Sequence, residues 1–116
     1  MFIFEDKPIY LNAKQFVVFV YSIVKTFPND EKFGLKDQIR RAVVSVLLNI
    51  SEGFIRGTKK EFIHFLWIAQ ESLSEVVSGF DIAKDLKYIT KDQWDQIYIE
   101  AEKLAKHINR IIYSKP

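Results

Sequence analysis

The sequence contains no cysteine, and only four glycines and three prolines among its 116 residues. The absence of cysteine excludes disulfides, thiolate metal ligands and a cysteine nucleophile, and it suits a reducing compartment, so we expect a cytoplasmic protein. So little glycine and proline leaves few turn signals for many short strands, which favours a few long helices. No apolar run is long enough to span a bilayer, and the first residues lack the basic start and apolar stretch of a secretory signal, so we expect no membrane association.

What the chain does contain is apolar side chains, 48% of the total. This content is sufficient to fill one core, and the length is that of one ordinary domain, so we expect a single domain over residues 1–116. Four stretches have apolar residues three or four positions apart, the spacing of one helix face. They cover residues 12–27, 35–54, 62–83 and 94–112. Four amphipathic helices joined by short loops predict an all-α fold, an antiparallel up-and-down four-helix bundle.

Candidate helix starts agree with these borders. Thr58 and Thr90 are each followed three positions later by Glu or Gln, the spacing of a capping box, in which side chains satisfy the free amides of the first turn. Asn12 stands three positions before Gln15 and gives a weaker version of the same signal. We therefore expect helices to begin at these three points.

The stretch that joins the second and third predicted helices reads Gly53-Phe-Ile-Arg-Gly57-Thr58-Lys59-Lys60. Its composition is that of a phosphate-binding loop, but only three residues separate the glycines, threonine precedes lysine, and a helix comes before it instead of a strand. We interpret it as a turn in which Gly53 and Gly57 take the left-handed conformation that ends a helix and Thr58 caps the next helix.

Basic residues are concentrated around this turn. The chain has a net charge of only +2, yet residues 35–60 hold six basic and two acidic residues. Lysine at a helix N-terminus opposes the helix dipole, so the turn alone does not explain Arg56, Lys59 and Lys60. Together with the free amides of the following helix they suit a phosphate backbone or another anion. The alternative is a solvated basic turn without a ligand.

A metal or catalytic site finds little support. Glu61 and His64 have the Glu-x-x-His spacing of di-iron bundles, but these bundles need the motif twice, and the only other histidine, His107, follows Leu104 where the motif needs Glu. Both side chains also fall off the apolar stripe of their helix. With no cysteine and no serine at a strand-to-helix elbow, we expect no enzyme, no metal and no cofactor.

Some apolar residues fall away from the core stripes when the helices are projected at about 100° per residue. They are Val44, Leu48 and Ile55 in the second helix and Ile63 and Trp67 in the third. Tryptophan is a frequent anchor of protein interfaces, so we expect these five residues to form a patch that is buried between the subunits of a homo-oligomer. Isolated exposed residues are the alternative.

The stretch LKDQIRRAVVSVLLNISEGFIRGTKKEFIHFLWIAQESLSEV closely resembles the signature of the four-helix-bundle proteins encoded by intervening sequences in bacterial 23S ribosomal RNA genes. The most specific parts are Gln38-Ile-Arg-Arg-Ala42, Asn49-Ile-x-Glu-Gly53, Lys59-Lys-Glu-Phe62 and Ser72-Leu-x-Glu75. The family pattern usually has proline near Leu47, alanine at Ser51 and glycine at Glu71.

This resemblance implies a ring-like homopentamer with no established enzymatic activity. The chain also looks like a relative of the accessory variability determinant proteins of diversity-generating retroelements, basic pentameric bundles that bind nucleic acid beside a reverse transcriptase. RNA or DNA and a reverse-transcriptase-like protein are therefore the implied partners, and a structural or protein-interaction bundle is the alternative. By this likeness the residues that contact nucleic acid are Arg40, Arg41, Arg56, Lys59 and Lys60.

Overall fold

The computed structural model describes residues 1–31 and 34–114. Its elements are α1 (Pro8–Val24), the short 3-10 helix η1 (Asn29–Glu31), α2 (Leu35–Ile55), α3 (Lys59–Asp85) and α4 (Lys91–Ile112). Within the described residues there is no strand. The predicted all-α class is confirmed.

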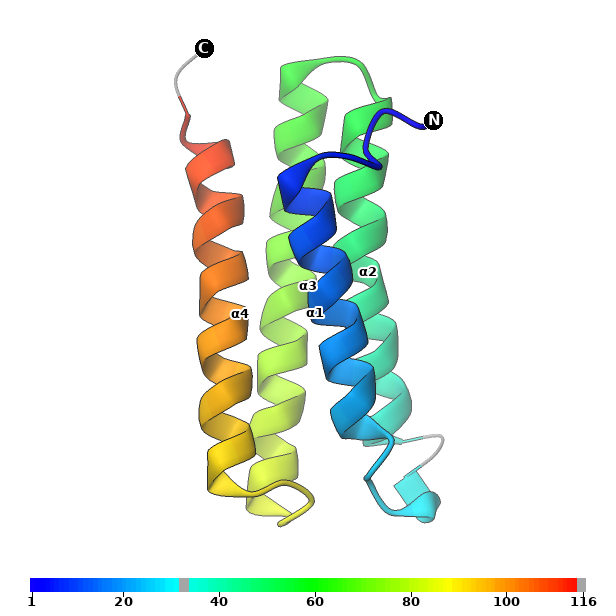
Figure 1. Ribbon diagram of the computed structural model, residues 1–116, viewed down its shortest axis with the longest axis vertical. Helices are drawn as coiled ribbons and strands as arrows, with labels where there is room; N and C mark the ends of the chain where they lie inside the picture. The colour runs from blue at the N-terminus through cyan, green and yellow to red at the C-terminus, as the bar shows by residue number, and fades with distance from the viewer. Residues whose placement is uncertain (32–33, 115–116) are drawn as a thin grey trace.

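The four long helices form an antiparallel up-and-down bundle (Figure 1). α2 contacts α1 and α3, and α4 contacts α3 and α1, so that α1 and α3 occupy opposite corners of the bundle. The α2–α3 turn lies at the same end as the N-terminal segment and the last turn of α4, whereas the α3–α4 turn lies at the other end. The predicted bundle topology is confirmed.

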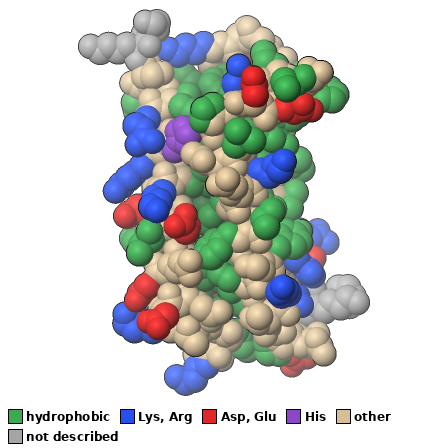
Figure 2. All heavy atoms as spheres, viewed as in Figure 1, with side chains coloured by type: hydrophobic (Ala, Val, Ile, Leu, Met, Phe, Trp, Pro, Cys, Tyr) green, Lys and Arg blue, Asp and Glu red, His purple; other side chains and the backbone are tan. Residues whose placement is uncertain are grey.

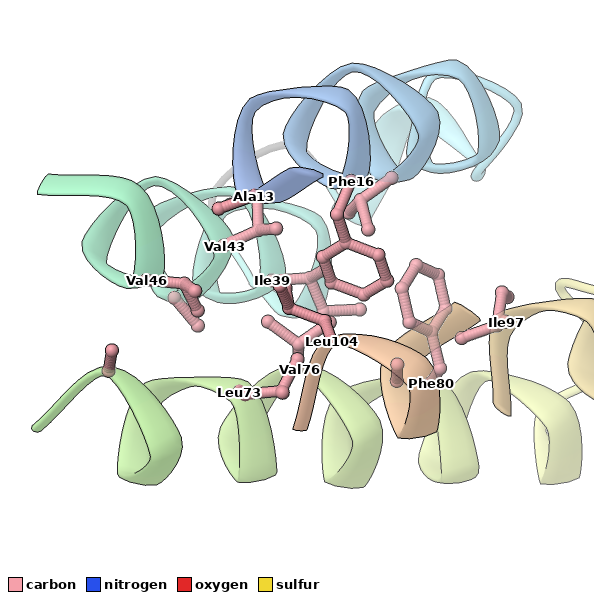
Figure 3. Close-up of a cluster of buried hydrophobic side chains, with 14 of the residues drawn as sticks. Ala13, Phe16, Ile39, Val43, Val46, Leu73, Val76, Phe80, Ile97 and Leu104 are labelled. Atoms are coloured by element: carbon pink, nitrogen blue, oxygen red, sulfur yellow. The ribbon is translucent and has the colours of Figure 1, made fainter. Parts of the chain in front are cut away.

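The core is built from the apolar stripes of all four helices, which point toward one another (Figure 3). Phe80 on α3 is completely buried, and its ring meets the edge of the Phe27 ring at a centroid distance of 6.2 Å. Completely buried side chains also include Val20, Val43, Val46, Leu66, Val76, Ile97 and Ile108. Each side chain of this size contributes about 1.5–3 kcal/mol when it leaves water, so this core is the main source of stability.

Threonine caps start two of the helices as predicted. The N–H of Glu61 donates to Oγ1 of Thr58 at 3.2 Å. At α4 the box is complete, because the N–H of Gln93 donates to the Thr90 hydroxyl and the Thr90 N–H donates to the Gln93 side chain. Both caps satisfy amides that have no partner within the helix.

The predicted start of the first helix at Asn12 is wrong, because α1 begins at Pro8. Proline suits the first helical position, since its missing N–H needs no partner there and its φ is already helical. Ile9 and Ala13 are buried and extend the apolar face toward the N-terminus. The Asn12 side chain reaches α4 instead, with its Nδ2 2.9 Å from Nδ1 of His107.

The two glycines of the predicted turn have different roles. Gly57 has a φ of +88°, so its left-handed conformation is confirmed. Gly53 lies inside α2 without a positive φ, and the prediction for this residue is wrong. A Cβ atom at Gly53 would lie 3.0 Å from Cδ1 of Phe62 and 3.2 Å from Cβ of Phe65. The absence of a side chain at Gly53 therefore allows the close packing of α2 against α3.

Candidate nucleic-acid interface

The α2–α3 turn consists of Arg56, Gly57 and Thr58, between the end of one long helix and the capped start of another. A shallow groove of about 430 Å³ beside it is lined by Gly57, Thr58 and Lys59 together with Phe62. Because a helix leads into the turn, the backbone lacks the strand-to-helix geometry that wraps a nucleotide phosphate. The interpretation as a helix-to-helix turn holds.

Arg56 is held against its own helix and the start of α3. Its Nη2 lies 2.9 Å from Oε1 of Glu52, and its guanidinium carbon lies 4.8 Å from the ring centroid of Phe65. An exposed ion pair of this kind is worth about 0–1 kcal/mol. Its main consequence is electrostatic, because the Glu52 carboxylate offsets the charge that Arg56 offers to an external anion.

Lys59 and Lys60 are the less compensated charges of the turn. Lys59 donates to the backbone oxygen of Ser114 at 3.4 Å, and both lysines are exposed. Within the described part of the chain, neither lysine forms an ion pair. Both stand in the first turn of α3, where the backbone N–H groups point out of the helix. Their charge is available to an anion at this end of the bundle.

Arg40 and Arg41 lie elsewhere on α2. Arg41 Nε is 2.9 Å from Oδ2 of Asp37, whereas Arg40 is half-buried and forms no ion pair with a described residue. Both line an open groove of about 630 Å³ between α1 and α2, together with Tyr21. With a rise of 1.5 Å per residue, Arg40 and Arg56 are roughly 24 Å apart along the helix axis. The five predicted basic residues therefore form two separate groups, one in this groove and one at the turn.

The five predicted interface residues are also distributed over several surfaces. Val44 and Leu48 line the groove between α1 and α2, and Ile55 is exposed near the end of α2. Trp67 lies on α3 toward α4, where its ring meets the edge of the Tyr113 ring at 6.1 Å. Ile63 lines the turn groove beside Ile111 of α4, and it packs against the core, as Val44 does. The structure does not bring the five together into one patch.

Glu61 and His64 both point to solvent at the start of α3. The described residues contain no group of three or more metal-binding side chains. His107, in contrast, is half-buried between α4 and α1. Burial and then the nearby Arg110 lower its pKa, which favours the neutral imidazole that can accept a hydrogen bond from Asn12.

The family model described as 23S rRNA-intervening sequence protein matches residues 5–110. The chain belongs to this family. Among solved structures, a crystal structure from Bacteroides thetaiotaomicron VPI-5482 is similar, with a TM-score of 0.84 and 25% sequence identity over 91% of this chain and 99% of that chain. It is described as a protein with unknown function from the S23 ribosomal protein family. Among curated protein sequences, none is a match. The predicted family membership is confirmed.

In this member of the intervening-sequence family, sequence reasoning missed part of the exposed apolar surface. Val18 and Tyr21 on α1 are exposed, and Tyr21 borders the groove that Val44 and Leu48 also line. The same helical projection that singled out residues of α2 and α3 would have found them.

None of the described helices is both long enough and apolar enough to cross a membrane.

Proposed function

We propose that this family member is a non-enzymatic homo-oligomer that binds the phosphate backbone of RNA or DNA through its α2–α3 turn. The observation that carries this proposal is the position of Lys59 and Lys60. Both are exposed, neither forms an ion pair with a described residue, and both stand where the amides of the longest helix begin. A helix N-terminus and adjacent cations favour a phosphate group.

Binding at the turn is expected to be independent of base sequence. Contacts from lysine to phosphate carry affinity and salt dependence but no direct sequence information. One subunit offers few such contacts, since Glu52 already offsets the charge of Arg56. An oligomer repeats the turn in every subunit, and linked weak contacts add through effective concentration.

A structural or protein-interaction bundle without a nucleic-acid role is the second candidate. Two features favour it: both Arg41 and Arg56 are paired with carboxylates of their own helix, and large apolar side chains such as Leu48 reach the surface. An enzyme has no supporting cluster of side chains among the described residues.

The test removes the charges of the turn while keeping its length. In the variant Arg56→Gln, Lys59→Gln, Lys60→Gln, binding of structured RNA and duplex DNA should weaken, and the slope of log affinity against log salt should become shallower by roughly 0.9 per lost phosphate contact. The matched control carries Lys84→Gln, Lys87→Gln and Lys91→Gln, which remove equal charge at the other end of the bundle.

The control variant should bind nearly as well as the unmodified protein. If both variants lose affinity equally, net charge and not the turn governs binding. If the turn variant binds as tightly as the unmodified protein at every salt concentration, or if the unmodified protein binds neither polymer, the second candidate replaces the first.

A further inference from the structure

Charged side chains without an ion-pair partner are segregated between the helices. Considering only the described residues, those on α1 and α2 are all basic, and those on α3 after its first turn are all acidic. The basic set is Lys14, Lys36 and Arg40, and the acidic set is Glu71, Glu75 and Asp85. The side formed by α1 and α2 therefore carries unpaired positive charge, and the side formed by α3 carries unpaired negative charge.

The basic residues on α1 and α2 lie next to exposed apolar side chains. On α1, Lys14, Val18, Tyr21 and, just past the helix, Lys25 follow one another at steps of four, three and four along an exposed stripe. Val18 is 66% exposed. On the other side of the groove between α1 and α2, α2 contributes Arg40, Val44 and Leu48. We call the surface of Lys14, Val18, Tyr21, Lys25, Arg40, Val44 and Leu48 the basic face. Figure 2 shows apolar side chains at the surface near lysine and arginine side chains over α1 and α2.

The acidic residues lie on the outer crest of α3. Exposed residues follow one another there at steps of three or four, and we call Trp67, Glu71, Ser74, Glu75, Ser78 and Ile82 the acidic ridge. Ser74 and Ser78 border both the groove toward α4 and the groove toward α2, so the ridge points directly away from the bundle. Ser74 and Ser78 have small side chains, so in the middle of the ridge a neighbouring helix can approach α3 closely.

We propose that the acidic ridge of one copy docks into the basic face of a second copy. The two surfaces do not meet within one molecule, because the ridge points away from the bundle, whereas the basic face lies on the side of α2 that is turned toward α1, and α1 and α3 occupy opposite corners. Opposite charge favours the contact of unlike faces, and contact between two basic faces or two ridges would bring like charges together. Leu48 and Val44 then meet the side of α3 that carries Trp67 and Ile82.

Contacts between unlike faces are heterologous, so each subunit offers one free face to the next and the assembly closes as a ring or continues as a chain. This explains why the off-core apolar residues of α2 and α3 do not share one surface. The inference rests on the homo-oligomer of the proposed function and names its two contact surfaces.

Reversing the charge of either face tests the pairing. The variant Glu71→Lys, Glu75→Lys and the variant Lys14→Glu, Lys25→Glu should each associate about tenfold or more weakly than the unmodified protein, as measured by light scattering over a concentration series. A chain with all four substitutions should regain the oligomer, because its faces are again opposite in charge. The matched control is Glu5→Lys, Asp92→Lys, which changes net charge equally at exposed positions away from α3 and should remain oligomeric.

Circular dichroism establishes that each variant is helical. A monomeric unmodified protein overturns both the oligomer and its faces. If the oligomer survives both charge reversals, or if the chain with all four substitutions stays dissociated, the proposed pairing of the two faces is wrong. The homo-oligomer of the proposed function is not affected by either result.

A cross-linking experiment tests the same contact without changing any charge. Because the chain has no cysteine, Leu48→Cys and Ser74→Cys each introduce a single thiol, one on each face. With a flexible bis-maleimide, chains carrying the two substitutions should cross-link when co-expressed, and neither variant should cross-link to itself. Self-cross-linking of Leu48→Cys, or no cross-link in the mixture, overturns the proposal.

Discussion

A Cβ atom added to Gly79 on α3 would lie 2.6 Å from Cγ1 of Ile39 on α2, closer than two non-bonded carbon atoms normally approach. Ile39 is 1% exposed, so its side chain would have to shift within a packed region to make room for this atom. Gly53 has the reciprocal role on α2, against Phe62 on α3. These two glycines allow α2 and α3 to form the most extensive helix contact of the bundle.

Gly79→Ala should therefore destabilise the protein. Alanine in a helix interior gains about 1 kcal/mol over glycine, but overpacking a well-filled core costs about 1–3 kcal/mol. We expect a net decrease in the free energy of unfolding, measured by urea denaturation. Ser78→Ala, one position earlier on the exposed side, is the control and should be neutral or slightly stabilising. A Gly79→Ala variant that is more stable than the unmodified protein would contradict the close contact.

The capping box at the start of α4 gives a second prediction. Thr90→Ala removes the hydroxyl that accepts from the Gln93 N–H, and an amide without its partner should lower the free energy of unfolding by about 1 kcal/mol. Thr90→Ser keeps the hydroxyl and should retain most of the stability. Equal loss in both variants, measured by thermal denaturation, would show that the Thr90 methyl group and not the cap matters.

The contact between Asn12 and His107 gives a prediction about pH. Burial and then Arg110 lower the pKa of His107 from its ordinary value of 6.5, so the unfolded chain takes up a proton more readily than the folded chain. The contribution of His107 to stability is thus complete above pH 6.5 and decreases as the pH falls below that value. His107→Gln should make the free energy of unfolding less dependent on pH in this range. His64→Gln, at an exposed position, is the control for the loss of one imidazole.

Much of the fold could be predicted from the sequence, because the helices are amphipathic and threonine caps are local signals. The steps of three and four located all four helices, and Thr58 and Thr90 marked two starts. Two errors arose where a signal depends on the neighbouring helix. Asn12 serves a contact with α4 instead of a cap, and Gly53 serves the close approach of α3 instead of a turn.

The candidate site was predictable only in part. The ion pair of Arg41 with Asp37 has the i,i+4 spacing of a helix surface pair, so the sequence alone could have shown it. The contact of Arg56 with the Phe65 ring could not have been seen in this way, because it depends on how α3 is rotated against α2. The same rotation decides that Leu48 and Trp67 lie on different surfaces.

The two internal ion pairs give the last prediction, because each one withholds an arginine from an external phosphate. Glu52→Gln frees Arg56 at the turn, and Asp37→Asn frees Arg41 in the groove between α1 and α2. Each pair is exposed enough that its loss should change the free energy of unfolding by no more than about 1 kcal/mol. Both substitutions raise the net charge equally, so a difference between them reports position.

If nucleic acid binds at the turn, Glu52→Gln should raise the affinity and steepen the slope of log affinity against log salt by up to about 0.9, whereas Asp37→Asn should do so much less. Filter binding over a salt series measures both quantities. The reverse order would place the phosphates in the groove between α1 and α2, where they would compete with the contact proposed between copies. Equal gains would mean that overall charge, and neither surface in particular, attracts the polymer.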